Sequence, residues 1–180
     1  MDFVNTIHDR YAAVPEDYLS DYSRYLGWSL RVGLVTAREA RALAALTPPP
    51  SLLREMRSLR EKLHRLFGAL VDGHAPEAAA LAGLEAWLHR AWRGLALDAR
   101  SPTWLAPKAR ATNATLPLQR LALSALDILQ HCPPARLKRC ASEDECGWLF
   151  IDETKNNRRR WCAMDTCGVR AKMQTYRRRH

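Results

Sequence analysis

The stretch from residue 139 to residue 172 reads RCASEDECGWLFIDETKNNRRRWCAMDTCGVRAK and holds four of the five cysteines of the chain. Cys140 and Cys146 form one close pair, Cys162 and Cys167 form a second, and fifteen residues lie between the pairs. A structural zinc ion is typically bound by four ligands in a tetrahedron, two from each of two loops. A linker of this length lets the chain return, so that the second pair can bind the same ion as the first. The spacing therefore predicts a zinc site formed by Cys140, Cys146, Cys162 and Cys167.

The residues between and after the two cysteine pairs predict a small finger. Residues 147–151 have the composition of a strand, Asn156 and Asn157 suit a turn, and residues 158–161 are expected to return as a second strand. Residues 163–179 are expected to form a helix. Knuckle, hairpin and helix in this order describe a treble-clef-like finger. A segment of about 45 residues buries too little surface to fold alone, so the metal is expected to hold it folded.

The alternatives to structural zinc for these cysteines are a disulfide framework, a catalytic zinc ion and a reversible thiol switch. A disulfide framework is disfavoured because the number of cysteines is odd. A catalytic zinc ion is disfavoured because four thiolates leave no coordination position for water or substrate. A reversible thiol switch remains open. The fifth cysteine, Cys132, is interpreted as a small buried apolar residue rather than a ligand.

The first 135 residues predict a helical bundle. Apolar residues recur at helical spacing. Thr36 begins a capping-box pattern at the start of one helix, and the three prolines 48–50 end that helix. Leu81, Leu84 and Trp92 belong to the apolar stripe expected to face the core. The helices are expected over residues 18–34, 36–46, 51–70, 76–95 and 116–130, with a loop and one or two short strands over residues 98–115.

These elements together predict a mainly α protein with two parts. Residues 1–134 are expected to form the helical bundle. Residues 135–180 are expected to form the small treble-clef-like zinc finger, with a β-hairpin and a helix. Zinc is the only cofactor that the sequence predicts.

Composition excludes several classes of protein. The 180 residues are 47% hydrophobic and 26% charged, which is typical of a folded protein rather than a disordered one. The longest uncharged run, residues 42–53, is too short to span a membrane, and residues 1–10 lack a secretory signal pattern, which favours the cytoplasm. No phosphate loop, helical His pair around a Glu or nucleophile elbow occurs, so we do not expect an enzyme.

Positive charge is concentrated in the same segment as the cysteines. The chain has a net charge of +9, of which +6 falls in residues 136–180. This coincidence favours a nucleic-acid partner, with arginines on phosphates and the last helix reaching base edges. A solvated helix end is the alternative. The residues expected to contact nucleic acid are Arg158, Arg159, Arg160, Arg170, Lys172, Gln174, Arg177 and Arg178.

A family resemblance follows from the residues around the cysteines. Its motif residues are Arg139-Cys140, Cys146 to Asp152, Asn156, Arg159 to Cys162, Met164, and Cys167 to Lys172. This pattern resembles the CGNR-type zinc finger, which lies at the C-terminus of bacterial regulators of transcription induced by stress. Those proteins carry an N-terminal helical ABATE domain that begins with a motif similar to residues 2–6 here. The resemblance implies a zinc-containing regulator with DNA as its partner.

Two positions depart from the family pattern. The first cysteine pair is one residue wider than usual, and the extra residue between Ala141 and Glu145 is expected to loop out without moving the thiolates. Val169 replaces the Asn that gives the motif its name, so the hydrogen bond of that Asn is missing.

The N-terminal motif and the finger lead to a hypothesis for function. Asp2, Asn5 and Thr6 are candidates for lining a small-molecule pocket, and a capped turn that fastens the terminus is the alternative. We therefore expect a DNA-binding transcription regulator whose helical domain senses a ligand or a protein. The alternative is a zinc-stabilised adaptor for protein interactions without nucleic-acid binding. The sequence leaves open the oligomeric state and the choice between DNA and RNA.

Overall fold

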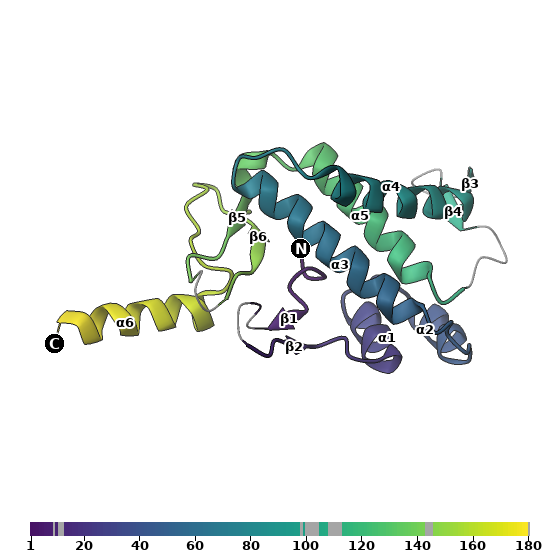
Figure 1. The fold of residues 1–180 in the computed structure, drawn as a ribbon, viewed down its shortest axis with the longest axis horizontal. Helices are drawn as coiled ribbons and strands as arrows, with labels where there is room; N and C mark the ends of the chain where they lie inside the picture. The colour runs from purple at the N-terminus through teal and green to yellow at the C-terminus, as the bar shows by residue number, and fades with distance from the viewer. Residues whose placement is uncertain are drawn as a thin grey trace. The chain divides into compact units, whose positions relative to one another are not determined.

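The computed structural model describes residues 1–8, 10, 13–97, 99, 105–107, 113–142 and 146–179. The described residues form six α-helices and three two-stranded antiparallel sheets, so the prediction of a mainly α fold is confirmed (Figure 1). The chain divides into two compact units. The helical unit comprises residues 19–63 and 77–131, and the finger unit comprises residues 1–18, 64–76 and 132–180. The N-terminal segment is therefore grouped with the C-terminal tail, and the division into domains at residue 134 stays a prediction.

The predicted helices all form, with small changes at their ends. Helix α1 begins four residues later than expected because the Asp21 side chain accepts a hydrogen bond from the backbone N–H of Arg24 at 2.9 Å and so caps it. None of the described helices combines the length and apolar character needed to cross a membrane. The helices are α1 (Tyr22–Arg31), α2 (Ala37–Ala44), α3 (Leu52–Val71), α4 (Ala78–Arg93), α5 (Leu116–His131) and α6 (Val169–Arg179).

The start of α2 shows how local sequence signals are used. The predicted capping box is present, because the Thr36 hydroxyl accepts from the backbone N–H of Glu39 and the Glu39 carboxylate accepts from the backbone N–H of Thr36. The same carboxylate also accepts hydrogen bonds from the two terminal nitrogens of the Arg120 guanidinium on α5, from Nη2 at 2.6 Å and from Nη1 at 2.8 Å. The hydrogen bond from Arg120 lowers the pKa of Glu39 to about 2. One side chain thus caps α2 and ties it to α5.

Apolar packing holds the helical unit together. Helices α4 and α5 run side by side (Figure 1). The apolar stripe predicted for α3 is confirmed as core, since Leu52, Met56 and Leu59 are all buried. The stripe predicted for α4 is partly wrong, because Leu81 and Trp92 are 46% and 48% exposed. Small residues occupy the buried face of α4 instead, together with two larger side chains; the face consists of Ala80, Gly83, Leu84, Trp87 and Ala91.

A short sheet follows α4 in the helical unit. Strand β3 (Leu95–Leu97) pairs antiparallel with β4 (Leu105–Pro107). Strand β4 lies within residues 98–115, where one or two short strands were expected, whereas β3 lies before that segment and begins at the residue expected to end the helix. Residues 98, 100–104 and 108–112 of that segment lie outside the described residues.

The finger unit contains two short antiparallel sheets. Strand β1 (Ile7–His8) pairs with β2 (Glu16–Asp17), and β5 (Leu137–Arg139) pairs with β6 (Leu149–Ile151). A short 3-10 helix, Pro134–Arg136, precedes β5, and a π-helical turn, Met164–Gly168, leads into α6.

The expected partner of strand β6 was wrong. We predicted that residues 158–161 would pair with it, whereas β5 does so. Residues 158–161 are not a strand because several of their backbone groups bond to side chains. The Lys138 ammonium donates to the carbonyl oxygen of Arg159 at 3.3 Å, and the Asp152 carboxylate accepts from the backbone N–H of Arg159 at 2.8 Å.

Candidate metal centre

The side chains of the four predicted cysteine ligands converge on one point. The Sγ atoms of Cys140, Cys146, Cys162 and Cys167 all lie within 4.8 Å of one another. Cys162 Sγ is 3.6 Å from both Cys146 Sγ and Cys167 Sγ. Thiolates at 2.3 Å from a tetrahedral zinc ion are separated by about 3.8 Å, so the arrangement fits one such ion. All four are free thiols rather than disulfides.

Two backbone features bring the first cysteine pair into place. Cys140 directly follows strand β5, and its backbone N–H donates to the carbonyl oxygen of Trp148 at 2.8 Å. Gly147 directly follows Cys146 and has a φ of +64°, a left-handed conformation that glycine adopts without steric cost. The chain can therefore reverse at Cys146 and continue into β6. Residues 143–145, where we expect the extra residue to loop out, lie outside the described residues.

The second pair is held by the π-helical turn and by its neighbours. Cys167 lies within Met164–Gly168, where the chain packs so tightly that a Cβ atom on Gly168 would lie 2.9 Å from Met164 Sδ. The backbone N–H of Cys162 points at Cys140 Sγ at 3.5 Å, which links the second cysteine pair to the first.

Electrostatics show why this cluster suits a cation. A hydrogen bond from the Cys162 thiol lowers the pKa of Cys146 to about 5, so one thiolate forms readily. Burial raises the pKa of Cys167 to about 11, and the hydrogen bond to Cys146 raises the pKa of Cys162 well above its usual range. Four thiolates this close repel one another, and a divalent cation bound among them removes that penalty. The donor set, all sulfur, is the one that soft, tetrahedral ions prefer.

Asp152 organises the loop that joins the two cysteine pairs. Its fully buried carboxylate accepts from the Lys138 ammonium at 2.6 Å and from the backbone N–H groups of Thr154 and Arg159 at 3.0 and 2.8 Å. Burial raises the pKa of Asp152, but the Lys138 ammonium and the other donors outweigh burial and hold the pKa well below its usual range. The positive φ of Asn157, 48°, completes the predicted turn.

Arg159 lies inside the finger. Its guanidinium donates to the carbonyl oxygens of Trp161, at 2.9 Å, and of Cys162, and it lies 4.9 Å from the centre of the Phe150 ring. These contacts fix the backbone that carries Cys162. Its role in the described structure is therefore to position the second cysteine pair.

The other residues predicted to contact nucleic acid are exposed. Arg160 lies in the loop before Cys162, with its guanidinium carbon 5.2 Å from the centre of the Trp161 ring. Helix α6 carries a second group at helical spacing. The exposed members of the predicted set are Arg158, Arg160, Arg170, Lys172, Gln174, Arg177 and Arg178.

The N-terminal motif is fastened to strand β6 within the finger unit. The Asn5 side-chain amide donates to the carbonyl oxygen of Leu149 at 2.8 Å, and its amide oxygen accepts from the backbone N–H of Leu149 at 3.0 Å. The Trp148 indole N–H donates to the carbonyl oxygen of Ile7 at 3.1 Å. The Thr6 hydroxyl donates to the carbonyl oxygen of Phe3, and Asp2 is exposed. These contacts match the fastening turn that we considered as the alternative to a pocket; the pocket itself stays a prediction.

Two residues that support the site, Lys138 and Asp152, were given no role in the sequence-based prediction. Lys138 and Asp152 lie on or directly after the paired strands β5 and β6, where alternation places them on the same side. The available signal was a charged residue in the middle of β5 and another directly after the apolar strand β6. The contact of Asn5 had no local signal, because its partner Leu149 is 144 positions away.

The fold and the cluster define a class of protein, one with a helical domain and a four-cysteine metal finger. The CGNR zinc finger family matches residues 136–180. The ABATE family, described as "Putative stress-induced transcription regulator", matches residues 1–131. The chain belongs to the ABATE family and carries a CGNR zinc finger, as the sequence motifs predicted. No curated protein matches the chain.

Proposed function

We propose that this protein is a transcription regulator that binds DNA through a zinc-folded finger. Zinc is the ion that best suits four thiolates in a tetrahedron, and the exposed arginines of the finger bind phosphates. The membership of the ABATE family, described as regulators of transcription, supports this role.

One observation carries the proposal: exposed basic side chains flank the second cysteine pair in the sequence on both sides. Arg158 and Arg160 precede Cys162, and Arg177 and Arg178 follow Cys167 on α6. Each of these four side chains is exposed. Metal binding therefore gives these cations a fixed spacing, which a flexible tail does not, and fixed cations bind a phosphate backbone with less loss of entropy.

The test is a salt titration of DNA binding with the full chain. Fluorescence anisotropy of a labelled duplex should give a slope of log affinity against log salt near about −5 if about six phosphates are contacted. Arg177→Glu combined with Arg178→Glu should weaken binding at least about tenfold and reduce the slope by about 2. Removal of zinc by a chelator should abolish binding.

A matched variant separates the effect of charge on the finger from the effect of the overall net charge. Arg31→Glu with Arg38→Glu makes the same change in net charge on exposed positions of the helical unit. This variant should bind DNA within about twofold of the natural chain, because the exposed charges that contact DNA lie in the finger. Equal weakening by both double variants, or no binding at low salt, would overturn the proposal.

The adaptor function is retained as a second candidate because of one observation. Val169, Met173 and Tyr176 share one face of α6 and are 45%, 54% and 66% exposed. Apolar side chains grouped in this way are typical of a protein contact surface. The adaptor reading predicts that Met173→Ser with Tyr176→Ser abolishes partner binding, while the double arginine reversal on α6 leaves it unchanged.

The helical unit offers one place for the sensing role within our proposal. A groove of about 450 Å³ lies between α3 and α4 and includes the side chains of Arg54, Lys62, Trp87 and Arg90. The Arg90 guanidinium lies 4.5 Å from the centre of the Trp87 ring. Glu55 also lines this groove and forms an ion pair with Arg90 at 2.7 Å, so Arg54 and Lys62 are the cations proposed to attract a small anionic effector beside the aromatic ring. A thermal-shift screen of anionic metabolites, repeated with Lys62→Ala, tests this role.

A further inference from the structure

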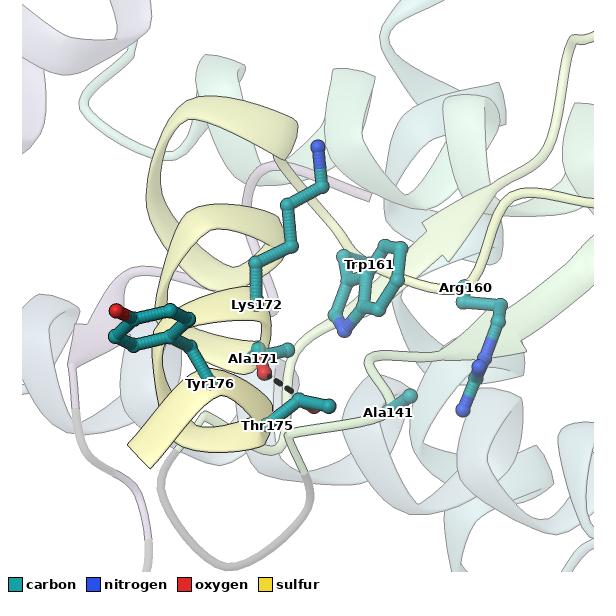
Figure 2. A pocket seen from close by; sticks show the side chains of 7 residues that line it. All are labelled: Ala141, Arg160, Trp161, Ala171, Lys172, Thr175 and Tyr176. Carbon is teal, nitrogen blue, oxygen red and sulfur yellow. Dashed lines mark hydrogen bonds between the residues drawn. The ribbon is translucent and has the colours of Figure 1, made fainter. Parts of the chain in front are cut away.

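A groove lies beside the cysteine cluster, between the loop that carries Trp161 and helix α6 (Figure 2). Its volume is about 460 Å³, and all of it belongs to the finger unit. The residues that matter for its chemistry are Arg160, Trp161, Ala171, Lys172 and Thr175. None of them is a cysteine ligand, so the groove is separate from the metal site.

The groove combines a flat aromatic side with cationic edges. The half-buried Trp161 indole packs against the cysteine cluster, which holds the ring in place. Figure 2 shows the indole between the side chains of Lys172 and Arg160. Lys172 is exposed and has no carboxylate partner among the residues that the structure describes.

The side of the groove formed by α6 is open because its residues are small. Ala171 and Thr175 are one helical turn apart, and the Thr175 hydroxyl turns back to donate to the carbonyl oxygen of Ala171 at 2.9 Å. Tyr176 lines the groove as well, but its ring points away from Trp161 (Figure 2). The space next to the indole is thus bordered by small side chains, with room for a flat ring.

We propose that this groove binds one unpaired nucleotide of single-stranded DNA. The base stacks on Trp161, and its phosphate lies near the ammonium of Lys172 and the guanidinium of Arg160. The inference rests on the proposed DNA binding and specifies the form of DNA that the finger prefers. Stacking of one base on an aromatic side chain is expected to raise affinity about tenfold or more.

Base pairing decides between the two forms of DNA. In a duplex, both faces of a base are covered by its neighbours, so an indole cannot stack on it without extrusion of the base. A single strand presents its bases freely, and every base has a face that can stack. An acidic peptide would satisfy Lys172 and Arg160 but would leave the indole without a flat partner.

The experiment compares one DNA strand with its own duplex. The zinc-loaded full chain is titrated by fluorescence anisotropy, at low salt, into a labelled strand of about twenty nucleotides without self-complementarity, alone and annealed to its complement. The natural chain should bind the single strand about tenfold more tightly. Thr175→Leu fills the groove without changing charge and should remove this preference, with duplex affinity within about twofold of the natural chain.

A control variant and the remaining outcomes keep the two proposals apart. Met173→Leu places a leucine on the same helix outside the groove and should leave both affinities unchanged. Equal affinity for both forms, or equal weakening of both by Thr175→Leu, overturns the groove proposal while DNA binding stands. No binding of either form overturns both proposals. Displacement by polyglutamate as effective as by unlabelled single strand also overturns the groove proposal and indicates an acidic protein partner.

Discussion

The two units of this protein are stabilised in different ways. The helical unit buries many apolar side chains, such as Leu59 and Leu118, and each contributes a part of the free energy of unfolding of that unit. The finger unit also buries apolar side chains, such as Phe67 and Leu149, but it depends in addition on a few polar atoms, the four Sγ atoms and the carboxylate of Asp152. Loss of one apolar contact leaves the rest of a core in place, whereas loss of one ligand removes the whole metal centre. The size of a substitution's effect should therefore depend strongly on which unit carries it.

Loss of one metal ligand is expected to have the largest effect. Cys162→Ser removes the Sγ atom that lies 3.6 Å from two other thiols, so the tetrahedron loses a corner. Zinc binding contributes roughly 10 to 16 kcal/mol to the folding of such fingers, and the tail should become sensitive to protease. Far-UV circular dichroism should keep most of its helical signal. Native mass spectrometry should show no bound metal.

The fifth cysteine provides the matched control. Cys132 lies outside the cluster, so Cys132→Ser should retain one metal ion per chain and the protease resistance of the tail. If Cys162→Ser kept its metal, or if both variants lost it, the four-cysteine centre would be the wrong description of the finger.

A core substitution in the helical unit is expected to have a smaller and separate effect. Leu118 on α5 is fully buried, and Leu118→Ala should reduce the free energy of unfolding by about 2 to 5 kcal/mol. Metal content should not change, because Leu118 belongs to the helical unit. Leu81→Ala, at a position that is 46% exposed, should cost less than about 1 kcal/mol. Urea denaturation followed by circular dichroism measures both, and loss of metal from Leu118→Ala would contradict this independence.

The contrast between the units also explains what the sequence could predict. Helix positions were predicted well because the capping box at Thr36 and the apolar spacing of α3 are local signals. The apolar stripe predicted for α4 was partly wrong, because two of the five buried residues are Ala and a third is Gly, and a search for large apolar side chains overlooks such residues. Small residues on a helix face allow close packing of the helices, but a pattern based on large hydrophobic residues does not identify such a face.

The sequence predicted the cysteine ligands of the site but not the side chains that hold the surrounding backbone in place. The cysteine spacing identified the thiols that converge, because two close pairs suffice to indicate a metal site. The partner of strand β6 was mistaken because side chains of Lys138 and Asp152 bond the backbone of the returning segment. A run of three arginines gave no indication that Arg159 differs from its neighbours, since burial of its guanidinium depends on the position of Phe150.

Loosening of the N-terminal segment should have an intermediate effect. Asn5→Ala removes two hydrogen bonds to the backbone of Leu149 and leaves its carbonyl and N–H without these partners. The expected loss of stability is about 1 to 3 kcal/mol. Hydrogen exchange should show faster exchange at the Leu149 amide, with the metal retained. The control Asn156→Ala changes an exposed asparagine in the turn of the finger and should leave the exchange rate at Leu149 unchanged.

The smallest effect concerns the ion pair between Glu39 and Arg120 and depends on pH. The folded state holds the pKa of Glu39 near 2, below its ordinary value of 4.5, so the folded state favours the carboxylate. The resulting stabilisation is fully present above pH 4.5 and is lost as the pH falls toward 2. Because the pair is partly exposed to solvent, its contribution should be on the order of 1 kcal/mol. Glu39→Gln keeps a side chain able to complete the capping box but loses the charge. The difference in unfolding free energy between the natural chain and this variant should therefore shrink as urea denaturation is repeated from pH 7 to pH 3, and a constant difference would show that the charge contributes nothing.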